Sequence, residues 1–160
     1  MLAVTLICVG KMKERHYLDA FAEYEKRLGA YCRFALVEIP EQRLSDEPGE
    51  REIAAALEKE AVQVEKHIPA GATVVAMCVE GQQFSSQDLA RQLTAWTNGG
   101  CSRLCFLVGG SFGLSPGLKA RADLRLSVSK MTFPHHLFRV MLAEQLYRSF
   151  GILAGSRYHK

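Results

Sequence analysis

Residues 104–120 read LCFLVGGSFGLSPGLKA: an apolar run, two adjacent glycines, and then a serine and a proline that can begin a helix. The apolar run is typical of a buried strand. Adjacent glycines directly after a strand allow the backbone to approach a ligand closely or to adopt a positive φ. Ser115 and Pro116 suit the first positions of a helix, whose N-terminal amides favour anions. The loop between strand and helix is therefore a candidate ligand site, although a plain glycine turn explains it equally well.

Strand-like and helix-like patterns alternate along the rest of the chain. Apolar, β-branched runs predict strands at residues 2–9, 34–39, 73–79, 104–108 and 124–128. Amphipathic spacing, caps and breakers predict helices at residues 17–28, 50–68, 86–98, 115–120 and 134–150. This alternation predicts an α/β fold, with a mostly parallel sheet and helices on both faces, in one domain that covers residues 1–160.

Three loops follow strand ends in the second half of this predicted sheet, at residues 80–84, 109–114 and 129–133. The first begins with Glu80-Gly81, which predicts a turn. The carboxyl ends of parallel strands form one edge of a sheet, where α/β proteins bind their ligands. The third loop lies in the run SVSKMTFPH at 127–135, whose backbone donors and acceptors suit the edge of a heterocycle. An ordinary strand-to-helix connection explains that run equally well.

The composition excludes several classes of protein. Hydrophobic residues make up 48% and charged residues 23% of the 160 residues, as in a globular domain rather than a disordered or fibrous chain. The longest apolar run, 2–9, is far shorter than the ~20 residues of a membrane span and lacks the flanks of a signal peptide. We therefore expect a cytosolic protein. The cysteines and histidines show neither redox nor metal-binding spacing, so we expect reduced, packed cysteines and no metal.

Positive charge concentrates in the last quarter of the chain. Residues 119–160 carry eight Lys or Arg against two acids, a net charge of +6, whereas residues 1–118 carry −3. This separation is typical of a protein with an anionic partner, either nucleic acid or a phosphorylated ligand. A solvated helix face is the alternative. Glu144 and Arg148 stand four residues apart in the favourable order, so Arg148 is a candidate for either a binding role or a helix ion pair.

Six short segments together resemble one known family. They read VGKMK at 9–13, AEYEKRL at 22–28, VGG at 108–110, SKMTFPH at 129–135, EQLYR at 144–148 and YHK at 158–160. The chain resembles the ribosomal RNA large-subunit methyltransferase H family of the SPOUT superfamily along essentially its whole length. The set of motifs near the C-terminus is the specific part of this resemblance.

The resemblance implies a fold, a reaction and a set of partners. The C-terminal part of the α/β sheet would form a trefoil knot, a rare exception to unknotted chains. The protein would be a homodimer that binds S-adenosylmethionine in the knot and methylates N3 of a pseudouridine in 23S ribosomal RNA on the assembled ribosome. Matched position by position, the cofactor-binding residues would be Met77, Gly109, Val128, Ser129, Lys130, Met131, Thr132 and Phe133.

The resemblance also implies candidate catalytic residues on the substrate side of the site: His135, Arg148, Tyr158 and His159. N3 of a uracil-type ring is a weak acid, so a base that accepts its proton, or a cation that stabilises the ring anion, assists methylation. Tyr158 or His159 would assist deprotonation, and Arg148 would stabilise the developing negative charge.

Two other classes of function remain open on the residues alone. A non-catalytic protein that binds the ribosome would use the same basic face but would have no reason to bind S-adenosylmethionine. An enzyme that depends on a nicotinamide or another nucleotide would share the general α/β pattern. The chain lacks the G-x-G-x-x-G fingerprint after the first strand, and no acidic residue follows that strand to hold a ribose, which disfavours this class.

Overall fold

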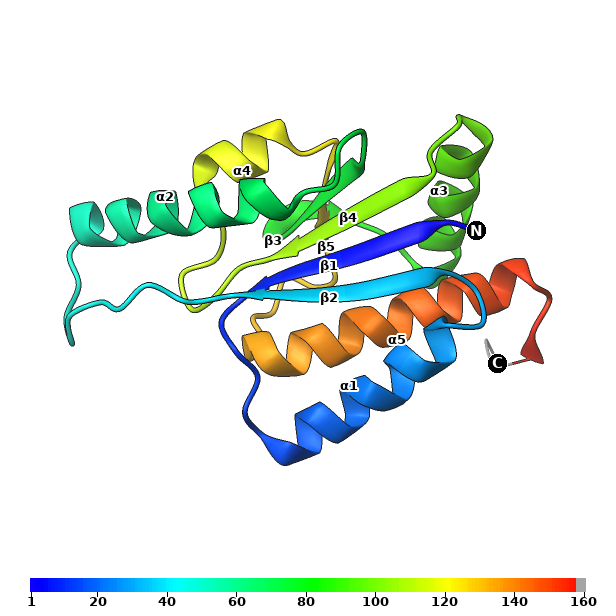
Figure 1. Cartoon of the computed structure of the whole chain (residues 1–160), viewed down its shortest axis with the longest axis horizontal. Helices are drawn as coiled ribbons and strands as arrows, with labels where there is room; N and C mark the ends of the chain where they lie inside the picture. The colour runs from blue at the N-terminus through cyan, green and yellow to red at the C-terminus, as the bar shows by residue number, and fades with distance from the viewer. Residues whose placement is uncertain (158–160) are drawn as a thin grey trace.

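Five strands form one parallel sheet in the order β2-β1-β4-β3-β5 (Figure 1). The structure is a computed structural model and describes residues 1–157. The strands are β1 Ala3–Val9, β2 Arg33–Ile39, β3 Thr73–Gln83, β4 Arg103–Val108 and β5 Leu124–Ser127. The helices are α1 Arg15–Leu28, α2 Glu50–His67, α3 Ser86–Asn98, α4 Pro116–Arg121 and α5 His135–Leu153. The predicted α/β alternation is confirmed, and every ladder between these strands is parallel.

Helices cover both faces of the sheet, as predicted. Figure 1 shows α2 and α4 on one side and α1 and α5 on the other, and α3 packs into the same core as α1 and α5. The two cores follow from the alternation of side chains along a strand. In β1, Leu6 and Cys8 belong to the core beneath α1, α3 and α5, whereas Ile7 and Val9 belong to the core beneath α2 and α4.

The helix boundaries follow local capping chemistry. Ser85 accepts a hydrogen bond from the backbone N–H of Asp88, whose carboxylate accepts from the Ser85 N–H in return, so α3 begins with a capping box. Ser115 caps α4 by accepting from the Leu118 N–H at 3.2 Å. Pro134 immediately precedes α5. These boundaries confirm the predicted helix starts to within one residue.

The turn predicted at Glu80-Gly81 is wrong, because β3 continues to Gln83. The ladder between β3 and β5 shifts register between Met77 and Gln82, so the strand carries a bulge there rather than a turn. A Cβ on Gly81 would lie 2.7 Å from the carbonyl carbon of Leu126. Glycine is needed at this position because the two backbones approach closely. The loop predicted at residues 80–84 is therefore also wrong, because residues 80–83 belong to β3.

The cysteines are unpaired, and three of them are buried. All five cysteines are free thiols, and burial raises the pKa of Cys8 and Cys105 to about 12 and that of Cys32 to about 11.

Within residues 1–157, none of the helices combines the length and apolar character that a membrane crossing requires.

Candidate functional site

A cavity of about 550 Å³ opens beside β3 and at the carboxyl ends of β4 and β5. This edge is on the left in Figure 1, where α5 also begins. Two loops distant in sequence form its walls, the glycine loop 109–114 and the loop 128–134, which we call the pre-α5 loop. The cavity lies at the edge of the sheet where parallel α/β folds bind ligands, as the position of these loops predicted.

The glycine loop folds tightly back on itself. The Gly113 N–H donates to the Gly110 carbonyl at 3.0 Å, and Gly113 adopts a φ of +76°, which favours glycine. A Cβ on Gly109 would overlap the backbone of Gly113. The glycines are therefore required for the turn itself, and Gly109 and Gly110 also line the cavity. The two interpretations of this loop from sequence, a tight turn and a ligand site, are compatible in one structure.

The pre-α5 loop is shaped by its own serine. The Ser129 hydroxyl accepts from the Met131 N–H at 3.0 Å, and its carbonyl accepts from the Ser127 hydroxyl at 2.8 Å. Met131 is 74% exposed and stands on the cavity wall. Of the eight residues matched to a cofactor role, the structure places seven on this cavity: Met77, Gly109, Val128, Ser129, Met131, Thr132 and Phe133. Lys130 is exposed and lies outside the lining.

His135 is the one described catalytic candidate on the cavity wall. Burial lowers the pKa of its imidazole below 6.5, and the positive charges of His136 and Arg139 lower it further, while the carboxylate of Glu41 acts in the opposite direction. The lowered pKa favours the neutral imidazole at pH 7. A neutral imidazole beside the cavity can accept a proton or a hydrogen bond from a ligand.

Arg148 lies thirteen residues further along α5 and does not line the cavity. At 1.5 Å per residue, this places it about 20 Å from His135 along the helix. Its Nε and Nη2 bind Oε1 of Glu144 at 2.9 and 2.5 Å, the helix ion pair that the sequence offered as one alternative. The other two catalytic candidates, Tyr158 and His159, lie outside the described residues.

A second group of residues at the same edge of the sheet could not be identified from the sequence. Glu41, just beyond β2, accepts a hydrogen bond from the Ser111 N–H at 2.9 Å and so holds the glycine loop. Lys119 and Glu80 both line the cavity, and they form an ion pair with each other at 2.6 Å. These contacts join residues 39 to 70 positions apart, which no local spacing could have indicated.

The fold and the cavity define an α/β protein with a candidate ligand site at the carboxyl edge of its sheet, between a glycine loop and the start of its last helix. Within residues 1–157, no cluster of three or more His, Cys, Asp or Glu side chains is placed to hold a metal ion.

Comparison with known proteins identifies the family. A family model described as "Predicted SPOUT methyltransferase" matches residues 2–159. A ribosomal RNA large subunit methyltransferase H from Bifidobacterium adolescentis is 45% identical, over 99% of this chain and 100% of the relative. The protein of the same name from Streptococcus pyogenes is 40% identical over the same shares. The chain therefore belongs to the SPOUT methyltransferases, in the family of ribosomal RNA large subunit methyltransferase H.

Solved structures agree on the fold. A probable methylase family protein from Haemophilus influenzae has a TM-score of 0.59 at 12% identity, over 100% of this chain and 72% of that one. The SpoU methyltransferase AviRb from Streptomyces viridochromogenes has a TM-score of 0.50 at 11% identity, over 96% and 61%. At these identities the likeness concerns the fold alone.

Proposed function

We propose that this methyltransferase binds S-adenosylmethionine in the cavity at the carboxyl edge of the sheet and methylates N3 of a pseudouridine in 23S ribosomal RNA. The substrate is the assembled ribosome in the cytoplasm, and the active species is a homodimer. The trefoil knot that the family resemblance implies around the pre-α5 loop is part of this proposal. The observation that carries it is the convergence of seven matched residues, from three separate parts of the chain, on one cavity.

The cavity fits this cofactor in size and in the chemistry of its walls. Its volume lies within the usual range for small-molecule sites, roughly 300–1,000 Å³. Apolar side chains, among them Met77, Leu126 and Phe138, offer a surface for a flat ring, while the backbone of the pre-α5 loop offers polar groups for its edge. Gly109 lines the cavity, and its lack of a Cβ allows the backbone of Gly113 to pack against it. When bound, S-adenosylmethionine supplies a methyl group on an electrophilic sulfonium sulfur.

The residues of the chain orient the target base and handle its proton. His135 stands on the cavity wall at the start of α5, and its neutral imidazole is available to accept a hydrogen bond from the base. Alignment of the reacting atoms is the main requirement of such a displacement, so a rigid wall matters more than a strong base. In this proposal Tyr158 or His159 assists removal of the N3 proton, and Arg148 stabilises the ring anion.

The distance along α5 supports the homodimer. Arg148 and His135 are separated by about 20 Å along α5, so one chain does not bring both to the same base. A symmetric dimer presents the same surface patch twice, and a second copy whose α5 runs antiparallel to the first would bring its own Arg148 toward the cavity.

The test has two steps, and both use the purified full-length chain. Calorimetry measures S-adenosylmethionine binding first, because a non-catalytic ribosome-binding protein would bind ribosomes without taking up this ligand. Ribosomes from cells lacking the gene are then incubated with the protein and cofactor, and 23S ribosomal RNA is mapped by mass spectrometry. We expect one added methyl group on a pseudouridine. Absence of cofactor binding, or of any new methyl group in the ribosomal RNA, would contradict the proposal.

A further inference from the structure

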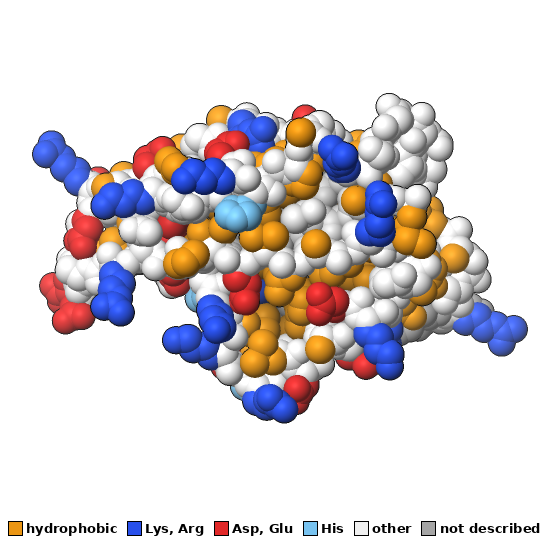
Figure 2. Space-filling view, viewed as in Figure 1, with side chains coloured by type: hydrophobic (Ala, Val, Ile, Leu, Met, Phe, Trp, Pro, Cys, Tyr) orange, Lys and Arg blue, Asp and Glu red, His pale blue; other side chains and the backbone are white. Residues whose placement is uncertain are grey.

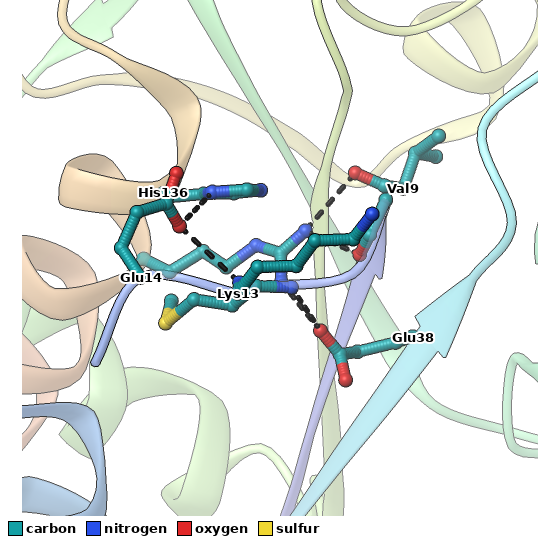
Figure 3. A network of polar contacts seen from close by, with 8 residues as sticks. Val9, Lys13, Glu14, Glu38 and His136 are labelled. Atoms are coloured by element: carbon teal, nitrogen blue, oxygen red, sulfur yellow. Dashed lines mark hydrogen bonds and ion pairs between the residues drawn. The ribbon is translucent and has the colours of Figure 1, made fainter. Parts of the chain in front are cut away.

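The β1–α1 loop, residues 10–14, is fixed to the start of α5 by a buried arginine (Figure 3). The side chain of Arg139 is fully buried. Its Nη2 donates to the carbonyl oxygens of Val9 and Gly10 at 3.0 and 2.6 Å, and its Nη1 donates to Oε2 of Glu38 at 2.9 Å. A loop whose backbone carbonyl accepts from a buried, ion-paired guanidinium has few alternative conformations.

Two carboxylates fix the remainder of the same loop. Oε2 of Glu38 also accepts from the Met12 N–H at 2.8 Å. Oε2 of Glu14 accepts from the Lys13 N–H at 3.2 Å and contacts Nδ1 of His136, on α5, at 2.7 Å. Figure 3 shows these contacts following one another along the loop. Glu38 and Glu14 are thus each engaged with a backbone N–H and with α5.

The two lysines of the loop remain available to a partner. Lys11 and Lys13 are exposed, and neither forms an ion pair with any residue of the part of the chain that the structure describes. Lys and Arg side chains project from this part of the molecule at the lower left of Figure 2. The composition does not reveal the positive charge of Lys11 and Lys13, because residues 1–118 carry a net charge of −3 as a whole.

The loop lies beside the cavity. A Cβ on Gly10 would stand 4.0 Å from Nε2 of His135, which lines the cavity wall, and Lys11 is the next residue. Lys130, exposed on the pre-α5 loop, is a third cation near the same cavity, and it too lacks an ion pair among residues 1–157. Cations held on rigid backbone around a base-binding cavity suit the phosphates that flank the base.

We propose that the β1–α1 loop is a preorganised phosphate-binding rim, in which Lys11 and Lys13 bind the backbone of the RNA that enters the cavity. This inference rests on the proposed function for the identity of the polyanion. Phosphate contacts position a nucleic acid without reading its sequence, so the rim sets the affinity for the ribosome and leaves the methyl-transfer step unchanged.

The test compares two double variants. Lys11→Gln/Lys13→Gln removes the rim charges, and Lys59→Gln/Lys66→Gln removes two exposed charges from α2, on the opposite face of the sheet, where Figure 2 shows side chains of both signs mixed. Binding to ribosomes from cells lacking the gene is measured by co-sedimentation between 50 and 200 mM salt. Methylation kinetics and calorimetry with S-adenosylmethionine follow on the same proteins.

We expect the rim variant to bind ribosomes about tenfold more weakly at 100 mM salt, with a slope of log K against log salt that is smaller by about 1.5. The rate at saturating ribosomes and the affinity for S-adenosylmethionine stay at wild-type values. Equal affinity and equal salt slope for the rim variant and the wild type would overturn the inference, as would an equal loss in the α2 control. Binding is measured apart from methylation, so a wild-type protein that fails to methylate refutes the proposed function and leaves this comparison decisive.

Discussion

The ion pair between Glu38 and Arg139 gives a sharp prediction about stability. Arg139 is completely buried, and Glu38 is 31% exposed at the end of the edge strand β2. Glu38→Ala leaves the guanidinium in the interior with no carboxylate and deprives the Met12 N–H of its acceptor. The Nε of Arg139 already has no hydrogen-bond partner among the described residues, so the change removes the charge partner from a group with one unmet donor.

The size of the effect follows from the burial of the cation. Removing one partner of a buried ion pair costs about 3–5 kcal/mol, and we expect Glu38→Ala to lower the free energy of unfolding by about 4 kcal/mol. With a urea dependence of roughly 2 kcal/mol per molar, the unfolding midpoint falls by about 2 M. Glu38→Gln keeps an oxygen for the Met12 N–H and for Arg139, so it costs less, about 1–2 kcal/mol.

Urea unfolding followed by circular dichroism measures all three proteins. Glu25→Ala, an exposed acid on α1, serves as the matched control and should change the unfolding free energy by no more than about 0.5 kcal/mol. A loss below about 1 kcal/mol for Glu38→Ala would refute the reasoning, because it would mean that water or another group replaces the carboxylate. The order of the variants is part of the prediction: a Gln variant as unstable as the Ala variant would show that the lost charge accounts for the whole effect and that the retained oxygen contributes little.

Three further predictions concern the cavity. Gly109→Ala should weaken S-adenosylmethionine binding in calorimetry by about tenfold or more, because its Cβ overlaps backbone, whereas Gly110→Ala should weaken it less, because its Cβ meets only the Glu41 carboxylate, whose contact with the Ser111 N–H it would disturb. In native protein at pH 8, a thiol reagent should modify the half-buried Cys78 and Cys101 and spare the three buried thiols, and the cofactor should protect Cys78, which lines the cavity. Because the pKa of His135 is lowered, its contribution to stability is complete above pH 6.5 and is lost as the pH falls through the lowered pKa. The unfolding free energy of the wild type should therefore fall relative to that of His135→Gln between pH 7 and pH 5, and parallel curves for the two proteins would contradict this.

Local chemistry was sufficient to predict the elements of the fold. Apolar runs of strand length, the Ser85 cap and the Pro134 start each depend on a few neighbouring residues, and each is found where expected. The error at Glu80-Gly81 arose because glycine after an acid usually marks a turn. Here the glycine serves a contact with β5 that forms about 45 residues later in the chain, so the cause is tertiary.

The site was predictable in part, and from two different sources. The two loops at the carboxyl edge followed from the strand pattern, which also predicted a ligand there. The assignment of individual residues came from the resemblance. It assigned Met77 to the cavity but not Cys78, Val79 and Glu80, which follow it in β3 and also line the cavity. Nor could it show that Lys130 faces solvent while its neighbours line the cavity. The direction of a side chain in an irregular loop depends on hydrogen bonds within that loop, such as those of Ser129.

The contribution of β2 to the site could not have been predicted, and the reason lies in the order of the strands. Neither Glu38 nor Glu41 lines the cavity, and by sequence both are surface acids near the end of an edge strand. The order β2-β1-β4 places that end beside α5 and the glycine loop, where Glu38 binds Arg139 and Glu41 binds the Ser111 N–H. Two carboxylates three residues apart thus hold the glycine loop and the first turns of α5. Because Glu38 also holds the β1–α1 loop, a change in this one strand should alter the start of α5 and the basic rim together.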